Sequence, residues 1–350
     1  MYPTKEHLSY GIFVKNQVDQ LNAAGVETVI AINDNPATGK KNVLKKYAKW
    51  ALQVWSTFRQ QKHNISLTHA HYVFPSGMFS YWLKKRYKIP YIVTAHGGDL
   101  NKMAKKSARI HSYTTKILQY ADHVITVGEE LATMVENDYN IPKERISVMS
   151  MGIDRTLFQK MDKQQAKQRI GMDMNHIHFL FVGNIIREKG VEELIQAFQA
   201  LEIKYTNQIS LHCIGSTKDQ YFTNIIQSQL TSANIHLIEP MPQTDLVRYF
   251  QAADFFILPS YMEGLGLVAL EAMSCGTPVI ASDVGGLHYM LQNDVGLPVP
   301  PKNKQALEQA MEQAVKGFNI NEIEQERLLQ IHDAERIIER VTELYKKVAK

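Results

Sequence analysis

The stretch that decides the fold covers residues 255–281 and reads FFILPSYMEGLGLVALEAMSCGTPVIA. Its first apolar run, Phe255–Leu258, predicts a buried strand. A loop follows, and an apolar helical stretch then extends over Gly266–Met273. Gly276 and Pro278 predict the end of this helix, after which the chain returns to a second buried strand. Strand, helix and strand in this order indicate a βαβ unit, which belongs in a parallel sheet.

The same alternation extends along the whole chain in two series. The strands predicted in the first series are Thr28–Ile32, Ser66–Ala70, Tyr91–Thr94, His123–Val127 and Ile146–Ser150. Those predicted in the second are Phe179–Val182, Leu211–Ile214, His236–Ile238, Phe255–Leu258 and Pro278–Ala281. Other helices are predicted over Phe13–Ala24, Val43–Gln60, Val191–Leu201, Thr244–Ala252 and Gly286–Leu291. Two series predict two doubly wound α/β domains, with a ligand cleft at the carboxyl ends of their strands.

The boundaries of these domains follow from the gaps between the two series. We expect a first domain over residues 1–158, a polar linker over 159–177, a second domain over 178–318 and C-terminal helices over 319–350 that return toward the first domain. A doubly wound domain opens with an apolar strand before its first glycine loop. No such strand precedes the loop-like stretch Tyr2–Gly11, so we expect that the first strand is missing, through truncation or a misassigned start.

Composition identifies a globular protein. The 350 residues are 45% hydrophobic and 21% charged, which excludes disordered and fibrous classes. Apolar runs of about four residues are far too short to cross a bilayer, and the N-terminus lacks the apolar core of a secretory signal. Two cysteines, Cys213 and Cys275, allow at most one disulfide bond. These features predict a cytoplasmic protein.

Charge is distributed unequally over the chain. Up to Arg155 there are 21 Lys and Arg against 12 Asp and Glu, and the remainder has 18 against 23. A basic first half fits nucleic acid, an anionic membrane or a phosphate-bearing acceptor. Nucleic acid is disfavoured because no helix-turn-helix or aromatic-interleaved basic pattern is present. Five lysines and two tryptophans within Lys40–Trp55 fit a helix at an anionic membrane surface, and equally a core-facing helix with a solvated outer face.

The loop after Leu258 contains groups that can bind a phosphorylated sugar. Glycines at the start of a helix let backbone N–H groups approach an anion, and the helix dipole favours negative charge there. Glu263 and Glu271 flank this turn, where carboxylates are poor phosphate ligands but good acceptors for sugar hydroxyls. The alternative is an ordinary strand–turn–helix with solvated glutamates.

A second loop, FVGNIIREKG over residues 181–190, follows the first strand of the second domain. It therefore ends at the same sheet edge as the Glu263 loop. Arg187 and Lys189 would supply positive charge for a diphosphate leaving group. A solvated basic pair at a helix start is the alternative interpretation.

Five motifs follow one another along the chain: Gly11 with Asn16 and Leu21, His96 to Asp99, Met151 to Phe158, Gly183 to Gly190, and Glu263 to Glu271. In this order they resemble the retaining, nucleotide-sugar-dependent glycosyltransferases of family 4, which have the GT-B fold of two Rossmann-like domains. The resemblance covers nearly the whole chain. It is nearest to group 1 glycosyl transferases that build cell-surface polysaccharides of the teichuronic acid type.

The resemblance implies catalytic roles for His96, Lys189 and Glu263. It implies donor binding by Gly11, Asn184, Arg187, Lys189, Met241, Glu263, Gly264, Leu265, Gly266 and Glu271. Within this set, Lys189 contacts the diphosphate, Glu263 the sugar hydroxyls and Glu271 the ribose. Gly97 and Asp99 belong to the acceptor side. In family members the leaving phosphate takes the acceptor proton, so neither a carboxylate nucleophile nor a cofactor is needed.

No metal site is expected. The chain has no Asp-x-Asp motif, and the pairs His69 with His71 and His176 with His178 lack a third ligand at a recognisable spacing. Asn184 departs from the family pattern, which usually has Arg there, and we expect Arg187 to supply the charge.

These patterns predict a metal-independent retaining glycosyltransferase that moves a hexosyl unit from a nucleoside diphosphate sugar to a surface polysaccharide or lipid-linked glycan. The protein would be cytoplasmic and peripheral on the inner membrane face. One alternative is a truncated or non-catalytic relative that keeps the fold without turnover. Another is a sugar epimerase on the same fold, for which no acid–base pair can be assigned.

Overall fold

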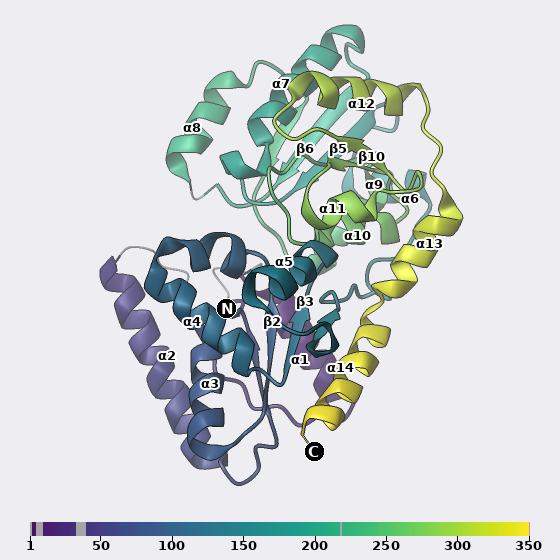
Figure 1. Ribbon diagram of the computed structural model, residues 1–350. Helices are drawn as coiled ribbons and strands as arrows, with labels where there is room; N and C mark the ends of the chain where they lie inside the picture. The colour runs from purple at the N-terminus through teal and green to yellow at the C-terminus, as the bar shows by residue number, and fades with distance from the viewer. Residues whose placement is uncertain (1, 5–9, 33–39, 218, 350) are drawn as a thin grey trace. The chain divides into compact units, whose positions relative to one another are not determined.

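The computed structural model describes residues 2–4, 10–32, 40–217 and 219–349, without the side chains of residues 40, 41, 43 and 44. The chain forms two compact units (Figure 1). Unit 1 comprises Met1–Gly152 together with Ala334–Lys350, and unit 2 comprises Ile153–Asp333. The C-terminal stretch is therefore part of unit 1. Part of the predicted loop Tyr2–Gly11, residues 5–9, lies outside the described residues.

Unit 1 is built on a parallel four-stranded sheet. Its strands are β1 (Thr68–His71), β2 (Tyr91–Ala95), β3 (His123–Thr126) and β4 (Ile146–Val148), in the order β1-β2-β3-β4. Its helices are α1 (Ile12–Ala23), α2 (Lys40–Gln61), α3 (Ser76–Tyr87), α4 (Ala108–Tyr120), α5 (Glu129–Tyr139) and α14 (Ala334–Val348). Thr68 pairs with Tyr91, and His71 pairs with Thr94.

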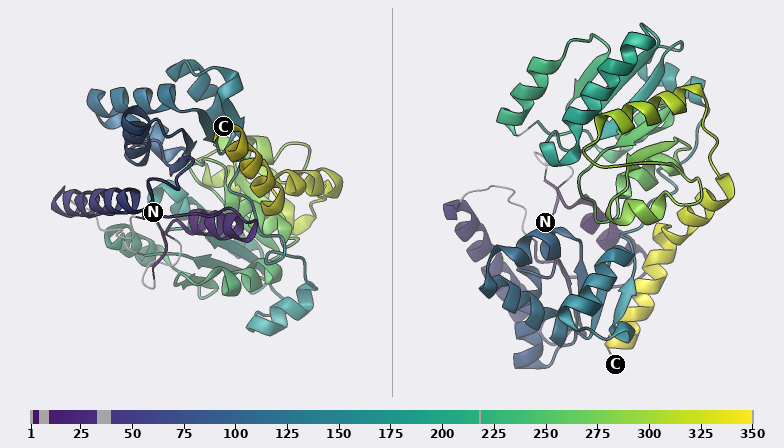
Figure 2. Two further views of the ribbon diagram at one scale, coloured as in Figure 1. Left: turned by 90° about the horizontal axis from the view of Figure 1, so that it is seen from below. Right: turned by 45° about the horizontal axis from the view of Figure 1, so that its top comes forward.

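Helices cover both faces of this sheet. Ile92 packs with Leu21 of α1 and with Ile337 of α14, which lies alongside α1 (Figure 2). The next residue back, Tyr91, points to the other face, where its hydroxyl donates to the carbonyl of Ile117 in α4. α14 buries its apolar stripe (Ile337, Ile338, Val341 and Leu344) in this core, whereas Ile331 before it is 52% exposed. The apolar residues 337, 338, 341 and 344 suggested a helix that lies on a surface, but α14 instead completes the core of unit 1.

The predicted strand Thr28–Ile32 is wrong. These residues have irregular backbone, and no strand among the described residues pairs with them. Val29 is 59% exposed and Ile30 39% exposed. A run of β-branched residues has the local preference for a strand, but a strand also needs a neighbouring backbone edge, which this segment lacks within the described sheet.

Unit 2 is built on a parallel six-stranded sheet. Its strands are β5 (Ile177–Val182), β6 (Ile209–Ile214), β7 (Ile235–Ile238), β8 (Phe255–Leu258), β9 (Val279–Ser282) and β10 (Leu297–Val299). Its helices are α6 (Lys163–Ile170), α7 (Val191–Lys204), α8 (Gln220–Gln229), α9 (Gln243–Ala252), α10 (Leu267–Ser274), α11 (Gly285–Met290), α12 (Lys304–Lys316) and α13 (Glu322–Ile331). β10 has no counterpart in the predicted strands, and α6 lies within the predicted linker.

The strand order of unit 2 is β10-β9-β8-β5-β6-β7. The chain builds outward from β5 to β7 on one side, then returns and builds from β8 to β10 on the other. This is the Rossmann order, and its topological switch point lies between β5 and β8, which pair through Phe179 and Phe255. Ligands of such sheets bind at the carboxyl ends of the strands beside the switch point.

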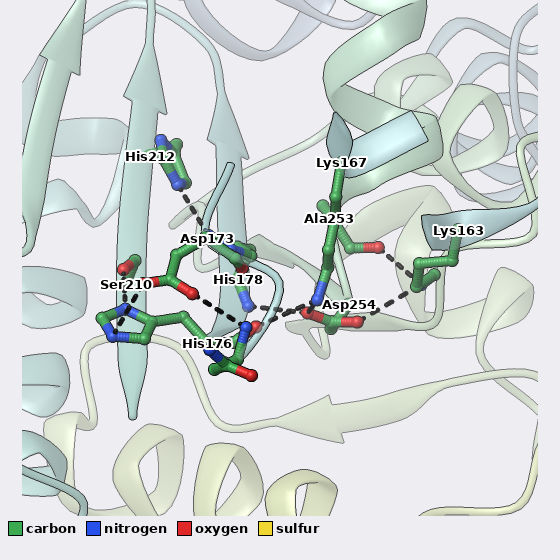
Figure 3. Close-up of polar contacts among 10 residues, drawn as sticks. Lys163, Lys167, Asp173, His176, His178, Ser210, His212, Ala253 and Asp254 are labelled. Atoms are coloured by element: carbon green, nitrogen blue, oxygen red, sulfur yellow. Dashed lines mark hydrogen bonds and ion pairs between the residues drawn. The ribbon is translucent and has the colours of Figure 1, made fainter. Parts of the chain in front are cut away.

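A polar network occupies the opposite, amino-terminal end of this sheet (Figure 3). The carboxylate of Asp254 lies 2.8 Å from Nζ of Lys167 and accepts a hydrogen bond from the backbone N–H of His178. Nδ1 of His178 lies 3.0 Å from Nε2 of His212. The network attaches α6 and the start of β5 to the loop before β8, so it belongs to the framework of unit 2.

Candidate functional site

The two predicted loops meet at the switch point of unit 2. The loop Gly183–Gly190 follows β5, and the loop that begins at Pro259 follows β8. The backbone N–H of Tyr261 donates to the carbonyl of Glu188 at 2.9 Å. Gly190 has a φ of +67°, and a Cβ there would lie 2.0 Å from the carbonyl oxygen of Pro259. Only glycine therefore allows the two loops to approach this closely.

Lys189 and Glu263 form an ion pair between these loops. Nζ of Lys189 donates to Oε1 of Glu263. The hydroxyl of Ser260, which is completely buried, donates to the same oxygen at 2.8 Å. The side chain of Glu263 remains 13% exposed and that of Lys189 27% exposed. A cation and a carboxylate thus face solvent together at the place where the strand order predicts a ligand.

The turn Gly264–Gly266 brings further backbone groups to this edge. Gly266, with a φ of +86°, lies directly before α10, and a Cβ on it would meet Leu287 at 2.6 Å. The carbonyl of Gly264 accepts the backbone N–H of Gly286 at 3.2 Å. Because the first N–H groups of a helix lack partners within it, the start of α10 can bind an anion.

Glu271 lies inside α10 and is half-buried. Its Oε1 accepts a hydrogen bond from Nε2 of Gln243, the first residue of α9, at 3.0 Å. Burial raises the pKa of Glu271 to about 8, and the hydrogen bond from Gln243 acts in the opposite direction. This carboxyl is therefore largely protonated at neutral pH without a ligand.

The other predicted donor residues lie around these loops. Asn184 and Arg187 are exposed, and Met241 is half-buried in the loop between β7 and α9. A guanidinium nitrogen of Arg187 lies 3.8 Å from the carboxylate of Glu192 in α7, and the guanidinium stacks 5.8 Å from the ring of Phe222. In this conformation Arg187 is paired with Glu192 of α7.

In unit 1, Asp99 connects two loops. Its Oδ2 accepts the backbone N–H of Val73 after β1 at 2.8 Å, and its Oδ1 accepts that of His96 after β2 at 3.1 Å. Asp99 is buried, which raises its pKa, while the N–H donors lower it. Gly97, at a φ of +97°, allows the tight turn between His96 and Asp99. Both carboxylate oxygens are used within the fold, so Asp99 holds the His96 loop in place.

His96 lies between aromatic side chains. The ring of Phe13, just after Gly11, is 5.1 Å from it, and the ring of Tyr72 is 4.5 Å away. Gly11 precedes α1 with a φ of +73° and accepts the N–H of Val14. Burial lowers the pKa of His96 to about 3, so this imidazole is neutral at physiological pH. The predicted residues Gly11, His96 and Asp99 thus gather at one edge of unit 1.

Sequence reasoning missed several residues that hold these groups. Ser260 lies within the stretch quoted at the start of the sequence analysis. A hydroxyl three residues before Glu263 indicates a hydrogen-bond donor for that carboxylate. Gln243 could not be found, because its contact with Glu271 joins helices that are distant in sequence. Gly215 was also missed: a Cβ there would lie 1.7 Å from the carbonyl oxygen of Gly183, so it lets the ends of β5 and β6 meet.

Within the described part of the chain, no three His, Cys, Asp or Glu side chains converge so as to hold a metal ion. His69 and His71 instead contact each other, with ring centroids 4.6 Å apart. None of the described helices is long and apolar enough to cross a membrane.

Two family patterns match the chain in succession. Glycosyltransferase Family 4 matches residues 11–157, and Glycosyl transferases group 1 matches residues 162–328. The chain belongs to the glycosyltransferases. Its two Rossmann-like units have the GT-B fold, which confirms the predicted fold class.

Relatives with similar sequences agree with this assignment. TuaC of Bacillus subtilis, named for teichuronic acid biosynthesis, is 27% identical over 350 residues, covering 89% of this chain and 86% of TuaC. A D-inositol 3-phosphate glycosyltransferase of Streptosporangium roseum is 28% identical over 65% of this chain, and the match spans only 56% of that relative.

The structural likeness concerns the fold alone, because sequence identity is low. Sucrose-phosphate synthase from Thermosynechococcus elongatus superposes with a TM-score of 0.81 at 22% identity, covering 96% of this chain and 92% of that one. HepE from Anabaena, in complex with UDP-glucose, superposes with a TM-score of 0.73 at 18% identity, covering 94% and 88%.

Proposed function

We propose that this glycosyltransferase moves a hexosyl unit from a nucleoside diphosphate sugar to a surface-polysaccharide or lipid-linked glycan, with retention and without a metal. The observation that carries the proposal is the meeting of the Lys189 and Glu263 loops at the switch point of unit 2. A cation, the backbone N–H groups at the start of α10 and a carboxylate together suit a diphosphate attached to a sugar.

The ion pair indicates how the donor would be held. On binding, Lys189 exchanges the carboxylate of Glu263 for the diphosphate, which carries more negative charge. Glu263 keeps the hydrogen bond from Ser260, so the carboxylate stays oriented and can accept the sugar hydroxyls. As the glycosidic bond breaks, negative charge builds up on the diphosphate, and Lys189 with the N–H groups at the start of α10 stabilises it.

Glu271 and the Met241 loop would bind the nucleoside. The ribose hydroxyls donate to the ionised carboxylate of Glu271, while Gln243 holds its Oε1. Met241, in the loop before α9, provides an apolar surface for the base. The nucleotide is then bound by β7, β8 and their following loops, which share one edge of the sheet.

His96 would orient the transferred sugar, a role that the family implies. Its pKa of about 3 means that it has no extra proton to give at neutral pH. It therefore acts through hydrogen bonds, and the leaving phosphate takes the acceptor proton. This division of roles fits retention without a carboxylate nucleophile.

Relatives support the substrate class. TuaC is named for teichuronic acid biosynthesis, and HepE was solved with UDP-glucose. We propose a uridine diphosphate hexose as the donor and an anionic surface glycan or its lipid-linked precursor as the acceptor. Residues 1–158, which lie mostly in unit 1, would form the acceptor-side domain, and residues 178–318 of unit 2 the donor-side domain.

The surface of unit 1 supports a peripheral position of this cytoplasmic protein on the inner face of the membrane. Residues 40–120 contain 13 Lys and 3 Arg but one acidic residue, Asp99, which is buried. Trp55 of α2 and Trp82 of α3 are 38% and 41% exposed, with rings 5.4 Å apart. Exposed tryptophans within a basic surface suit an anionic bilayer. α2 also buries Trp50 and Phe58, so it faces the core with its other side.

Hydrolysis of nucleotide sugars tests the enzymatic proposal. The purified protein is incubated with a panel of UDP-, GDP- and ADP-hexoses, and nucleoside diphosphate release is measured with and without EDTA. We expect slow release from UDP-hexoses that EDTA does not change. Tight UDP binding without release from any donor, also in the presence of membrane glycolipid, would favour the non-catalytic alternative.

The membrane position needs its own experiment. Flotation with vesicles of phosphatidylglycerol and phosphatidylcholine should recover the protein with the anionic vesicles at low salt and less of it at high salt. A Lys85→Glu/Lys88→Glu variant should bind less than a variant with both residues changed to Gln. Equal recovery on neutral and anionic vesicles would contradict electrostatic docking.

A further inference from the structure

Three histidines form a row at the carboxyl edge of the unit 1 sheet. His69 and His71 lie two residues apart on β1, so they point to the same face. The ring of His71 is 4.6 Å from that of His69 and 5.4 Å from that of His96. Nδ1 of His71 lies 3.2 Å from Nε2 of His96. The row therefore ends at the histidine that the proposed function assigns to the sugar.

The far end of the row is anchored. Nδ1 of His69 lies 2.6 Å from the hydroxyl of Tyr345 in α14, and its Nε2 lies 2.7 Å from Oγ1 of Thr94 in β2. Both nitrogens of His69 are occupied, so its ring is fixed. The stacked ring of His71 is held against a rigid neighbour.

The backbone beyond His71 is held in an unusual conformation. Tyr72 has a φ of +72°, a left-handed conformation that costs a residue with a side chain roughly 1 kcal/mol. Its N–H donates to the carbonyl of Thr94, and the next N–H, of Val73, donates to Asp99. In an extended strand the ring of Tyr72 would point to the face opposite that of His71. The left-handed turn instead places this ring against His96.

We propose that His71 is a positioning residue for His96: it occupies Nε2 of His96, couples the tautomer of His96 to its own and leaves Nδ1 as the nitrogen that a sugar hydroxyl can reach. The inference rests on the proposed role of His96. Burial lowers the pKa of both imidazoles, so each is neutral. Two neutral rings joined by one hydrogen bond share a single hydrogen between these nitrogens, so both rings carry their hydrogen on Nδ1 or both carry it on Nε2.

Two substitutions at His71 separate positioning from packing. His71→Asn keeps a polar atom at the position of Nδ1, because both atoms are two bonds from Cβ. His71→Phe keeps the ring and its stacking but removes the hydrogen bond. His123→Phe is the matched control, since His123 is a buried histidine of the same sheet at its amino-terminal end, with lowered pKa and a bond to Ser147.

Steady-state donor hydrolysis gives the first readout. We expect His71→Phe to lower kcat by roughly 10- to 100-fold with KM within about twofold, because the ring of His96 is misplaced only in the reacting complex. His71→Asn should restore most of kcat, and His123→Phe should keep wild-type kinetics. A wild-type kcat for His71→Phe, with a strongly reduced kcat for His96→Ala, would overturn the positioning role and leave the proposed function intact.

The second readout does not depend on activity. In protein labelled with ¹⁵N-histidine, long-range ¹H–¹⁵N spectra report which nitrogen of His96 carries hydrogen. We expect His71 and His96 to show the same tautomer in the wild type, and the tautomer balance of His96 to change in His71→Phe. An unchanged tautomer in His71→Phe would refute the inference, even if His96→Ala had wild-type activity and the proposed role of His96 were wrong.

Discussion

Nucleotide binding should strengthen as pH rises from 7 to 9, because of Glu271. Its pKa of about 8 in the free protein results from burial. The ribose hydroxyls are donors and favour the ionised carboxylate, so binding selects that form. About one tenth of the protein has Glu271 ionised at pH 7 and about nine tenths at pH 9.

The magnitude follows from this fraction. The apparent Kd is the intrinsic Kd divided by the competent fraction, so it should fall by about tenfold between pH 7 and pH 9. The phosphates of UDP titrate with a second pKa of about 6 and contribute little over this range. Binding at pH 7 should also release close to one proton, since the bound form is ionised.

Isothermal titration calorimetry with UDP measures both quantities. The Kd is determined at pH 7, 8 and 9, and proton release is obtained from buffers with different ionisation enthalpies. Glu271→Gln should bind weakly, with a flat pH profile and no proton release. Glu188→Gln, which changes an exposed carboxylate in the neighbouring loop, should behave like the wild type. The same pH dependence in the wild type and in Glu271→Gln would refute the role of this carboxyl.

Three further predictions concern the framework of unit 2. Asp254→Ala leaves Lys167 buried without its partner and should cost about 3 kcal/mol in denaturant unfolding, whereas Asp245→Ala, in an exposed pair, should cost less than about 0.5 kcal/mol. Burial lowers the pKa of His212 from 6.5 to about 3. The free energy of unfolding that neutral His212 contributes is therefore complete above pH 6.5 and falls by about 1.4 kcal/mol for each pH unit below it. His212→Gln should reduce this dependence of the free energy of unfolding on pH. Gly190→Ala should weaken UDP binding by about tenfold or more, because the added Cβ would push the β5 and β8 loops apart. Calorimetry measures this binding, and an unchanged Kd would contradict the prediction.

Local patterns predicted most of the second unit. The quoted stretch gave β8 with its observed bounds, because a short apolar run between turn residues has few other interpretations. β10 was missed since Leu297–Val299 is only three residues long and contains Pro298. Thr28–Ile32 has the composition of a strand, but pairing depends on which backbone lies beside it, and composition does not report that.

The candidate site likewise contains some contacts that local motifs predict and others that depend on how distant elements pack. Lys189 and Glu263 were predicted to share a sheet edge, and the parallel topology brings them into contact. The partner of Glu271 and the bond between His71 and His96 depend on how elements pack. The spacing of His69 and His71 argues against a metal motif, and strand alternation already predicts that both side chains lie on one face of the sheet.

The most direct test of the donor site is the turnover of Lys189→Ala with a nucleotide sugar. Lys204→Ala is the control, because Lys204 ends the same helix α7 that follows the Lys189 loop, about 20 Å further along, and pairs with surface glutamates. We expect Lys189→Ala to lower kcat for donor hydrolysis by about 100-fold or more, with a smaller effect on the Kd for UDP, and Lys204→Ala to match the wild type. Wild-type turnover in Lys189→Ala would contradict a diphosphate held between the β5 and β8 loops.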